Sequence, residues 1–416
     1  MEIGMRERNP EKAIEEFRNI FGEKGEWFLQ IVKEVVKFRK DGQRITDILV
    51  REGGSPLLAV LKNFFPLEGL EKIKVERDDI RAFVETILKS VMRGKEYEDF
   101  CRHKLKSIDF SFSIYGLGVF RVNYSADTNG DTLNIRVLDF MIPEFDEVLL
   151  PKIYVDYLKK RLILKKRLVL EGKETFASMV NGGGLIIHAG ETGSGKTTTI
   201  ASEIKFIADN TNGIVITYEN PIEYRFLPFL YPRVRQLEIG RHIYLEDIHS
   251  HFLRNSPSVG MIGEMRTKDE FIKVLDLASR GHLVITTMHS RNVVEAVFTY
   301  LNMITPEMKE FFFGVVRAIV CHKLMVNKRC EIVPFYEVLF FEPPVRSFFL
   351  KEKDLNYQKI SNYFYKEQKG SLVKEGYFYP FEQSVRDRVK ERFIEGEDEK
   401  NYAMSIILGV QEQKKF

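Results

Sequence analysis

One short glycine-rich segment limits the fold of this chain more than any other feature of its 416 residues. Residues 190–197 read GETGSGKT and match the pattern G-x-x-x-x-G-K-[ST] in full. An apolar run, 184–188, precedes this loop, and a plausible helix, 198–207, follows it. Glycines let backbone N–H groups converge on phosphate oxygens, and the N-terminus of the following helix adds a favourable dipole. We therefore predict an α/β fold whose loop binds the phosphates of ATP.

The residues of this loop have separate expected roles. Lys196 would contact the β- and γ-phosphates, and the hydroxyl of Thr197 would ligate Mg²⁺. The alternative is a glycine-rich turn without a ligand. The predicted ATP-binding residues are Gly190, Glu191, Thr192, Gly193, Ser194, Gly195, Lys196, Thr197 and Thr198.

Four apolar runs with strand character recur through the middle of the chain. They cover residues 184–188, 213–217, 259–262 and 283–287, and the segments between them are long enough for helices. Such alternation is typical of a mostly parallel, buried sheet with helices on its faces. Polar or ionisable groups follow each run, so we expect them to gather at the carboxyl edge of the sheet, where open α/β sheets bind ligands.

Three carboxylates at that edge are candidates for the chemistry. Glu264 follows the third run, at the position where a P-loop ATPase has the acid that orients or deprotonates water. A surface carboxylate is the alternative. Glu219 and Glu223 follow the second run and could hold a metal ion or water, or cap a helix beginning near Pro221.

Two histidines flank the fourth run. His289 follows it and could donate a hydrogen bond to the γ-phosphate, with a core histidine as the alternative. His282 precedes the run in an ordinary Gly-His turn. Neither has a cysteine or another histidine at close ligand spacing, which argues against a zinc site.

The first 140 residues follow a different pattern. Apolar side chains at helical spacing over 13–38 predict two amphipathic helices. Farther on, alternating segments and the turn signal DTNG predict an antiparallel hairpin. The predicted strands are 109–113, 118–125 and 132–138. The two prolines and weak periodicity of 141–151 indicate an interdomain linker.

Composition narrows the choice of partner and compartment. With 63 Lys and Arg against 60 Asp and Glu, the charge is too near balance for nucleic-acid or membrane binding through bulk electrostatics. The 3 cysteines are widely spaced, which disfavours a secreted disulfide scaffold and favours a reducing cytoplasm. The longest apolar stretch falls short of the roughly 20 residues that span a bilayer, so we expect no direct membrane insertion.

Four motifs in order carry a specific resemblance. GETGSGKTTT, TYENPIEY, IGEMRT and GHLVITTMHS are similar to the Walker A, Asp-box, Walker B and His-box motifs of the type II/IV secretion ATPase (GspE/PilT) superfamily. Within it, the chain most resembles the PilT-like type IV pilus retraction ATPases. DFSFSIYGLGVFRVNYS, before the loop, is similar to that family's PAS-like domain. FFFGVVRAIVCHKLM, FYEVLFFEPPVRSFF and the later run from GYFYPF are similar to its C-terminal helices.

The resemblance implies a domain order and an assembly. The expected parts are an N-terminal helical extension (1–40), a PAS-like α+β domain (41–140), a linker (141–152), a RecA-like P-loop ATPase domain (153–348) and a C-terminal helical region (349–416). The resemblance also implies a homo-hexamer in which Arg121 and Arg136 reach the nucleotide from the PAS-like domain. A guanidinium suits this role because it offers a planar fork of donors to developing phosphate charge. A solvent-facing arginine is the alternative at each position.

In this family the motor acts on a pilus platform protein of the inner membrane, so the resemblance implies a location at the cytoplasmic face of that membrane. Assembly and type II secretion ATPases usually carry a four-cysteine zinc subdomain, which 3 scattered cysteines cannot supply. This favours retraction over extension.

Several positions depart from the family pattern. The chain has Val137 where a second arginine is usual, Asn220 where Asp is usual, and Thr267 and Ser258 where two further Asp residues are usual. An expected arginine near Thr128 is also missing. Three hypotheses follow: an active retraction motor; an accessory or weakly hydrolysing paralogue that works beside a homologous retraction or assembly ATPase; and a RecA-like motor on nucleic acid, which the charge balance does not favour.

Overall fold

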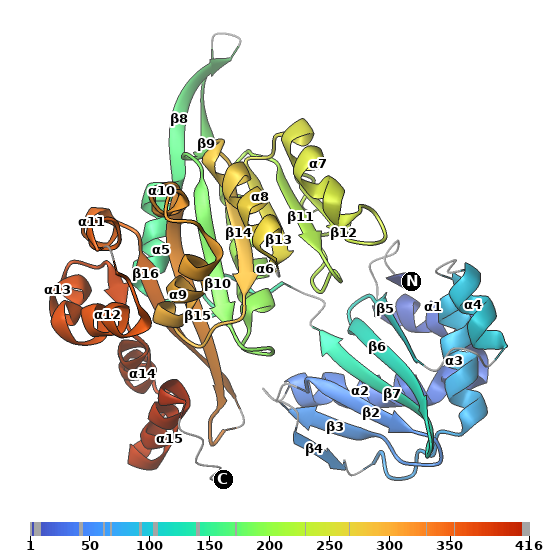
Figure 1. Cartoon of the computed structure of the whole chain (residues 1–416). Coiled ribbons are helices and arrows are strands. Elements are labelled where there is room, and N and C mark those ends of the chain that lie inside the picture. The colour runs from blue at the N-terminus through green and yellow to red at the C-terminus, as the bar shows by residue number, and fades with distance from the viewer. Residues whose placement is uncertain are drawn as a thin grey trace. The chain divides into compact units, whose positions relative to one another are not determined.

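The computed structural model describes residues 2–3, 10–40, 45–60, 63–66, 69–90, 94–102, 107–138, 142–170, 173–228, 230–265, 267–329, 331–352 and 354–409. The chain divides into two compact units, Met1–Met141 and Ile142–Phe416 (Figure 1). We call them the first and the second unit and describe each by itself.

Helices and an antiparallel sheet make up the first unit. Its described helices are α1 (Pro10–Phe21), α2 (Glu26–Lys40), α3 (Arg77–Ser90) and α4 (Gly94–Cys101), with a 3-10 turn at Gly22–Gly25. The two helices predicted over 13–38 are therefore confirmed as α1 and α2. Their apolar faces pack into the same core as α3 and the sheet, where the ring of Phe28 contacts those of Phe17, Phe83 and Phe112. The segment predicted as an N-terminal extension thus shares one core with the residues that follow it.

The sheet of the first unit has the described strand order β1-β5-β6-β7-β2-β3-β4. Its strands are β1 (Glu2–Ile3), β2 (Asp47–Arg51), β3 (Leu57–Val60), β4 (Asn63–Pro66), β5 (Ser107–Ile114), β6 (Gly118–Asp127) and β7 (Gly130–Leu138). All neighbours pair antiparallel except β1 and β5. The predicted DTNG hairpin is confirmed: it joins β6 to β7, the carboxylate of Asp127 accepts the backbone N–H of Asn129 at 2.7 Å, and Gly130 takes φ +115°.

A mixed, mainly parallel sheet forms the centre of the second unit, as the alternating runs predicted. Its described order is β12-β11-β13-β14-β10-β15-β16-β17, with all pairs from β12 to β15 parallel and the last two antiparallel. The strands are β10 (Gly184–Gly190), β11 (Val215–Glu219), β12 (Val234–Glu238), β13 (Val259–Glu264), β14 (Leu283–Met288), β15 (Val316–Val326), β16 (Ile332–Phe340) and β17 (Phe378–Tyr379).

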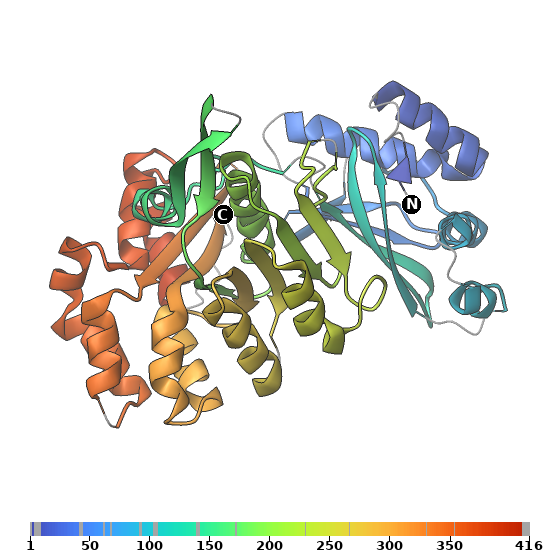
Figure 2. The same ribbon diagram turned by 90° about the horizontal axis from the view of Figure 1, so that it is seen from above.

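Helices cover both faces of this sheet (Figure 2). On one face Ile186 of β10 packs with α5 (Lys152–Tyr157) and α6 (Lys196–Asn210). On the other, Leu185 and Ile187 pack with the remaining helices. Among them are α7 (Ile248–Asn255), α8 (Lys268–Ser279), α9 (Val293–Met303), α10 (Met308–Val315) and α11 (Pro343–Lys351). The side chains of β10 are buried on both faces, as a central parallel strand requires. Residues 142–150, within the predicted linker, also bury Phe145 and Val148 in this unit.

One prediction about the end of the chain is wrong. FFFGVVRAIVCHKLM and FYEVLFF, which resembled C-terminal helices, are largely strands β15 and β16 of the central sheet. Their β-branched and aromatic side chains are buried in the central sheet, where β15 pairs with β10 and β16 pairs with β15, and this pairing satisfies the buried backbone groups. The helices that do follow are α12 (Tyr357–Asn362), a π-helical turn (Tyr363–Glu367), α13 (Lys369–Lys374), α14 (Phe381–Lys390) and α15 (Gly396–Leu408).

A two-stranded ribbon in the second unit had no counterpart in the sequence predictions. Strands β8 (Ile163–Leu170) and β9 (Lys173–Val180) pair antiparallel and extend beyond the central sheet (Figure 1). The ribbon follows a π-helical turn, Leu158–Leu162, at the end of α5.

Candidate active site

The predicted phosphate loop lies between β10 and α6, as expected. Gly195 precedes the helix with φ +89°, a left-handed conformation that glycine adopts without strain. Gly190 is needed for a different reason, because a Cβ at this position would come within 2.4 Å of the Ser194 hydroxyl oxygen. Gly190 and Ser194, the first and fifth residues of the loop, therefore lie close together at the end of β10, just before the N-terminus of α6. Helix N-termini with free N–H groups attract anions.

Lys196 is held over the same loop. Its ammonium donates hydrogen bonds to the backbone carbonyls of Gly190 at 2.5 Å and Glu191 at 2.9 Å. Burial lowers the pKa of this ammonium, while the neighbouring carboxylates of Glu264 and Glu223 raise it. The lysine therefore lies within electrostatic reach of two of the predicted acids.

Glu264 and His289 form a contact pair. Glu264 ends β13 and His289 follows β14, and the parallel pairing of these strands sets Glu264 beside Thr287. The imidazole Nε2 of His289 lies 3.0 Å from Oε1 of Glu264. The side chains remain partly exposed, 30% for Glu264 and 50% for His289. This places the pair at the surface of the sheet's carboxyl edge, so the core alternative for His289 does not hold.

Glu219 is the most strongly perturbed of the predicted acids. It ends β11, is 8% exposed, and its Oε1 accepts the hydroxyl of Thr217 at 2.6 Å and the amide of Gln236 at 3.0 Å. Burial raises the pKa of Glu219 to about 7, although both of these hydrogen bonds lower it. The alternative that Glu219 or Glu223 caps a helix near Pro221 does not hold, since residues 220–228 contain no helix. The Gln236 amide instead donates to the carbonyl of Tyr224 in this segment at 2.8 Å.

A buried polar network behind the loop was missed by the sequence analysis. His188 on β10 lies 2.8 Å from His322 of β15 and 3.1 Å from the carboxylate of Glu203 on α6. The hydroxyl of Tyr154 on α5 donates to both oxygens of Glu203 at 3.0 Å. Burial, reinforced by His188, holds the pKa of His322 well below its ordinary range. The only signal in the sequence was a histidine in an otherwise apolar strand, two residues before Gly190.

Side-chain contacts also link the helix α6 to its surroundings. The hydroxyl of Thr198 lies 3.0 Å from that of Tyr224, and Thr199 lies 3.3 Å from the hydroxyl of Tyr336 on β16. Thr198 therefore ties the start of α6 to the segment after Glu219.

The two predicted arginines lie in the first unit. Arg121 of β6 and Arg136 of β7 stand directly opposite each other in the ladder. The guanidinium of Arg136 pairs with the carboxylate of Asp47 at 3.3 Å. Val137, where the family pattern has a further arginine, is buried at 6% exposure.

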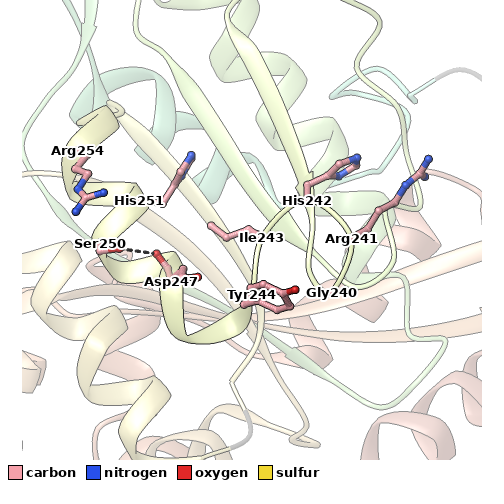
Figure 3. A pocket seen from close by; sticks show the side chains of 9 residues that line it. All are labelled: Gly240, Arg241, His242, Ile243, Tyr244, Asp247, Ser250, His251 and Arg254. Carbon is pink, nitrogen blue, oxygen red and sulfur yellow. Dashed lines mark hydrogen bonds between the residues drawn. The ribbon is translucent and has the colours of Figure 1, made fainter.

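Two hollows lie on the surface of the second unit. The one beside the site has a volume of about 390 Å³, lined by Glu191, Thr192, His289, Ser290, Arg291 and Glu295. The other, about 440 Å³, is rich in cationic side chains and was not foreseen. In Figure 3, His251 and Arg254 come from α7, while Arg241 and His242 come from the loop after β12. Most of its lining side chains are exposed.

The oxygen ligands present at the edge suit Mg²⁺. The ion prefers hard oxygen donors, and Thr197 in the first turn of α6 and the nearby carboxylates are of that kind. Within the described part of the chain, no cluster of three His, Cys, Asp or Glu side chains could hold a metal by itself. Mg²⁺ would therefore need oxygens of a bound phosphate as well. Among the helices that the structure describes, none has the length and apolar character to cross a membrane.

Comparisons with known proteins agree with this geometry. Residues 162–353 match the family described as type II/IV secretion system protein. The chain is 29% identical to the type IV pilus ATPase PilU of Pseudomonas aeruginosa over 257 residues, which cover 61% of this chain and 58% of the relative. It is 24% identical to the type IV pilus retractation ATPase PilT of the same organism over 280 residues, 65% of this chain and 73% of the relative.

The fold has a close counterpart among solved structures. A crystal structure of the pilus retraction motor PilT with bound ADP superposes with a TM-score of 0.67 at 23% identity, over 90% of this chain and 96% of that one. This likeness confirms the predicted RecA-like α/β fold. Residues 162–353 are therefore a domain of the type II/IV secretion ATPase superfamily, and the resemblance to its PilT-like members that the motifs indicated is confirmed.

Proposed function

We propose that this chain hydrolyses ATP and works as a motor of type IV pilus retraction. The observation that carries the proposal is the convergence of Lys196, the N-terminus of α6 and the Glu264–His289 pair at one edge of a parallel sheet. The relatives named for pilus motors support the choice of this process over others that use the same fold.

Each group has a role that its position allows. Lys196 and the backbone N–H groups at the start of α6 would bind the phosphates and neutralise their charge. The Glu264 carboxylate would accept a proton from the attacking water. His289 would hold that carboxylate through Nε2 and, in the doubly protonated form, would donate from Nδ1 to the γ-phosphate. Thr197 would hold Mg²⁺, which when bound supplies further neutralisation of phosphate charge. Glu219, with Gln236 and Thr217 fixing one of its oxygens, would orient water or the ion.

The wider machine follows from the family. We propose a homo-hexamer at the cytoplasmic face of the membrane, bound to the pilus platform protein, in which Arg121 and Arg136 reach the nucleotide. The ion pair of Arg136 with Asp47 would have to open, or leave one guanidinium face free, for that contact. No role in nucleic-acid binding is proposed.

The first experiment is an ATPase assay on the purified chain. We expect the wild-type chain to hydrolyse ATP and Glu264→Gln to have a kcat at least about 100-fold lower. A factor of about 100 is the lower end of the range for removing a catalytic base. ATP binding should persist in Glu264→Gln and weaken strongly in Lys196→Ala. Equal turnover of wild type and Glu264→Gln in assembled rings would refute the assignment of Glu264.

The direction of the motor is tested in cells of the source organism. A clean deletion that leaves excess surface pili without motility would support retraction, whereas cells without pili would support an assembly or secretion ATPase. Complementation with the wild-type gene is the control.

A second candidate function is an accessory, weakly hydrolysing subunit beside a homologous motor. The specific observation in its favour is Val137, a buried apolar side chain where the family pattern has an arginine. An arginine that stabilises transition-state charge can contribute roughly a thousandfold in rate in other NTPases. This candidate would be favoured if the isolated chain binds ATP with negligible turnover, and if the chain supports motility in cells only when a homologous motor is also present.

A further inference from the structure

We propose that Glu337 is a positioning residue that couples the C-terminal helical segment, through Tyr365, to the His289–Glu264 pair. This inference rests on the proposed ATPase function and adds to it a route by which movement of the C-terminal segment changes turnover. Glu337 lies outside the loop, acid and histidine motifs of the sequence.

Glu337 joins three elements at one buried carboxylate. It lies on β16 with 1% exposure. Its Oε2 accepts the backbone N–H of Val293, the first residue of α9, at 2.8 Å. The hydroxyl of Tyr365, in the π-helical turn Tyr363–Glu367, donates to Oε1 at 2.9 Å and to Oε2 at 3.0 Å. The carboxylate thus connects the central sheet, the start of α9 and the C-terminal segment.

The turn between Val293 and His289 has little freedom of its own. The Ser290 hydroxyl, 4% exposed, donates to the carbonyl of Asn292 at 2.9 Å. The side chain of Asn292 caps α9 by accepting the N–H of Glu295 at 2.9 Å, and the Arg291 N–H donates to the Glu295 carboxylate at 2.8 Å. A displacement of Val293 is therefore passed along a fixed turn to His289, whose imidazole contacts Glu264 at 3.0 Å.

Stability alone does not explain a carboxylate at this place. Burial raises the pKa of Glu337 to about 7, which means that the ionised form is costly in this environment. A well-packed apolar side chain is often neutral or stabilising in place of a buried charged group. What an apolar side chain cannot do is accept the N–H of Val293 and the hydroxyl of Tyr365 together.

A second contact ties the same region to the C-terminal helices. The ammonium of Lys323 on β15 donates to the carbonyls of Ile406 and Ile407 in α15 at 3.1 and 2.8 Å. Lys323 also lowers the pKa of Glu337, though less than burial raises it. The C-terminal helices are thus attached to the sheet at several polar points, among them bonds of Ser384 and Arg388 to β16, and the one at Glu337 leads to the catalytic pair. Single-turn π-helical segments such as the one that carries Tyr365 are frequent at functional sites.

The test compares two hydroxyl deletions in the same turn. Tyr365→Phe removes the donor to Glu337 and leaves the ring that packs 5.9 Å from Phe378. Tyr363→Phe is the matched control, since the Tyr363 ring stacks on Phe348 and no described partner bonds its hydroxyl. We expect kcat to fall roughly tenfold in Tyr365→Phe, the scale of losing a partner that orients a catalytic group, with KM for ATP unchanged. Tyr363→Phe should match wild type.

Hydrogen–deuterium exchange gives a readout that does not depend on activity. Residues 289–295 should exchange faster in Tyr365→Phe than in Tyr363→Phe, while α6 exchanges alike in both. Glu337→Gln, whose amide oxygen still accepts the Val293 N–H, should retain more turnover than Glu337→Met.

Each outcome decides one claim. If kcat and exchange over 289–295 are the same in Tyr365→Phe and Tyr363→Phe, the coupling through Glu337 is wrong. Faster exchange throughout the second unit would also refute it, because that result indicates a general loss of stability. If wild type does not hydrolyse ATP, the proposed function fails, and the exchange comparison still decides whether Tyr365 holds the turn.

Discussion

Replacing Glu219 by glutamine should stabilise the second unit in a pH-dependent way. The carboxylate lies at the end of β11 with 8% exposure, and burial raises its pKa from an ordinary 4.5 to about 7. The folded state therefore holds this proton more tightly than the unfolded state does. Between pH 4.5 and 7 the unfolded chain releases the proton while the folded chain keeps it, so the stability contributed by this group falls as pH rises.

The magnitude follows from the two pKa values. Their difference corresponds to a destabilisation of the folded state by about 3 kcal/mol. This destabilisation is complete above pH 7 and mostly absent at pH 5. Glutamine keeps an oxygen to accept the hydroxyl of Thr217 and the amide of Gln236 and carries no charge. Any cost of its NH₂ group is the same at both pH values. The difference in unfolding free energy between Glu219→Gln and wild type should therefore be about 2 to 3 kcal/mol more favourable to the variant at pH 8 than at pH 5.

Urea unfolding at pH 5 and pH 8 measures this difference. Far-ultraviolet circular dichroism follows both units, whereas fluorescence follows the single tryptophan, Trp27, which is buried in the first unit. The shift should appear in the dichroism transition and leave the fluorescence transition in place. Glu246→Gln, at an exposed carboxylate of the same unit, is the control and should change stability alike at both pH values. A gain for Glu219→Gln that is equal at pH 5 and pH 8 would refute the reasoning.

Two further substitutions test the packing around the site. Tyr154→Phe removes a hydroxyl that donates to the fully buried carboxylate of Glu203, so we expect a loss of about 1.5 to 3 kcal/mol in unfolding free energy, measured against Tyr244→Phe at an exposed tyrosine. Gly260→Ala should cost about 1 to 3 kcal/mol, because its Cβ would lie 1.9 Å from the Phe252 ring, and an unchanged thermal midpoint would contradict this.

Much of the site could be predicted because its residues follow short motifs that are continuous in the sequence. The loop between β10 and α6 is a continuous motif, and the parallel runs indicated that residues following separate strands would meet at one edge. That reasoning placed Glu264 and His289, which are 25 positions apart in the sequence, at the same edge without any knowledge of contacts. The central strands could be predicted in the same way, because each of the four apolar runs is continuous in the sequence and is typical of a strand buried on both faces.

Other parts of the fold depend on partners far away in sequence. The run from Val316 to Val326 follows a helical segment directly and has the apolar content of a buried helix. Only its pairing with β10 on one side and β16 on the other makes it a strand. Short apolar runs are ambiguous between the two states when periodicity alone is used. The ribbon β8–β9 was not predicted for a related reason, since among the described strands these two pair with each other in a separate sheet.

The burial of ionisable groups was not predicted, even for Glu219, which the sequence did indicate as an acid of the site, and the positions of these groups carry functional meaning. Glu203, Glu219 and Glu337 each lie on an element that borders the loop, the acids or the histidine turn, and each is nearly inaccessible. A sequence pattern cannot distinguish such a carboxylate from an exposed one, because what is decisive is the hydroxyl or amide that another segment brings to it. Each of the three accepts a hydroxyl: Glu203 from Tyr154 on α5, Glu219 from Thr217 on its own strand, and Glu337 from Tyr365 in the C-terminal segment. Since apolar side chains would fill the same space with less desolvation, three such groups around one site indicate selection for fixed geometry at the expense of stability.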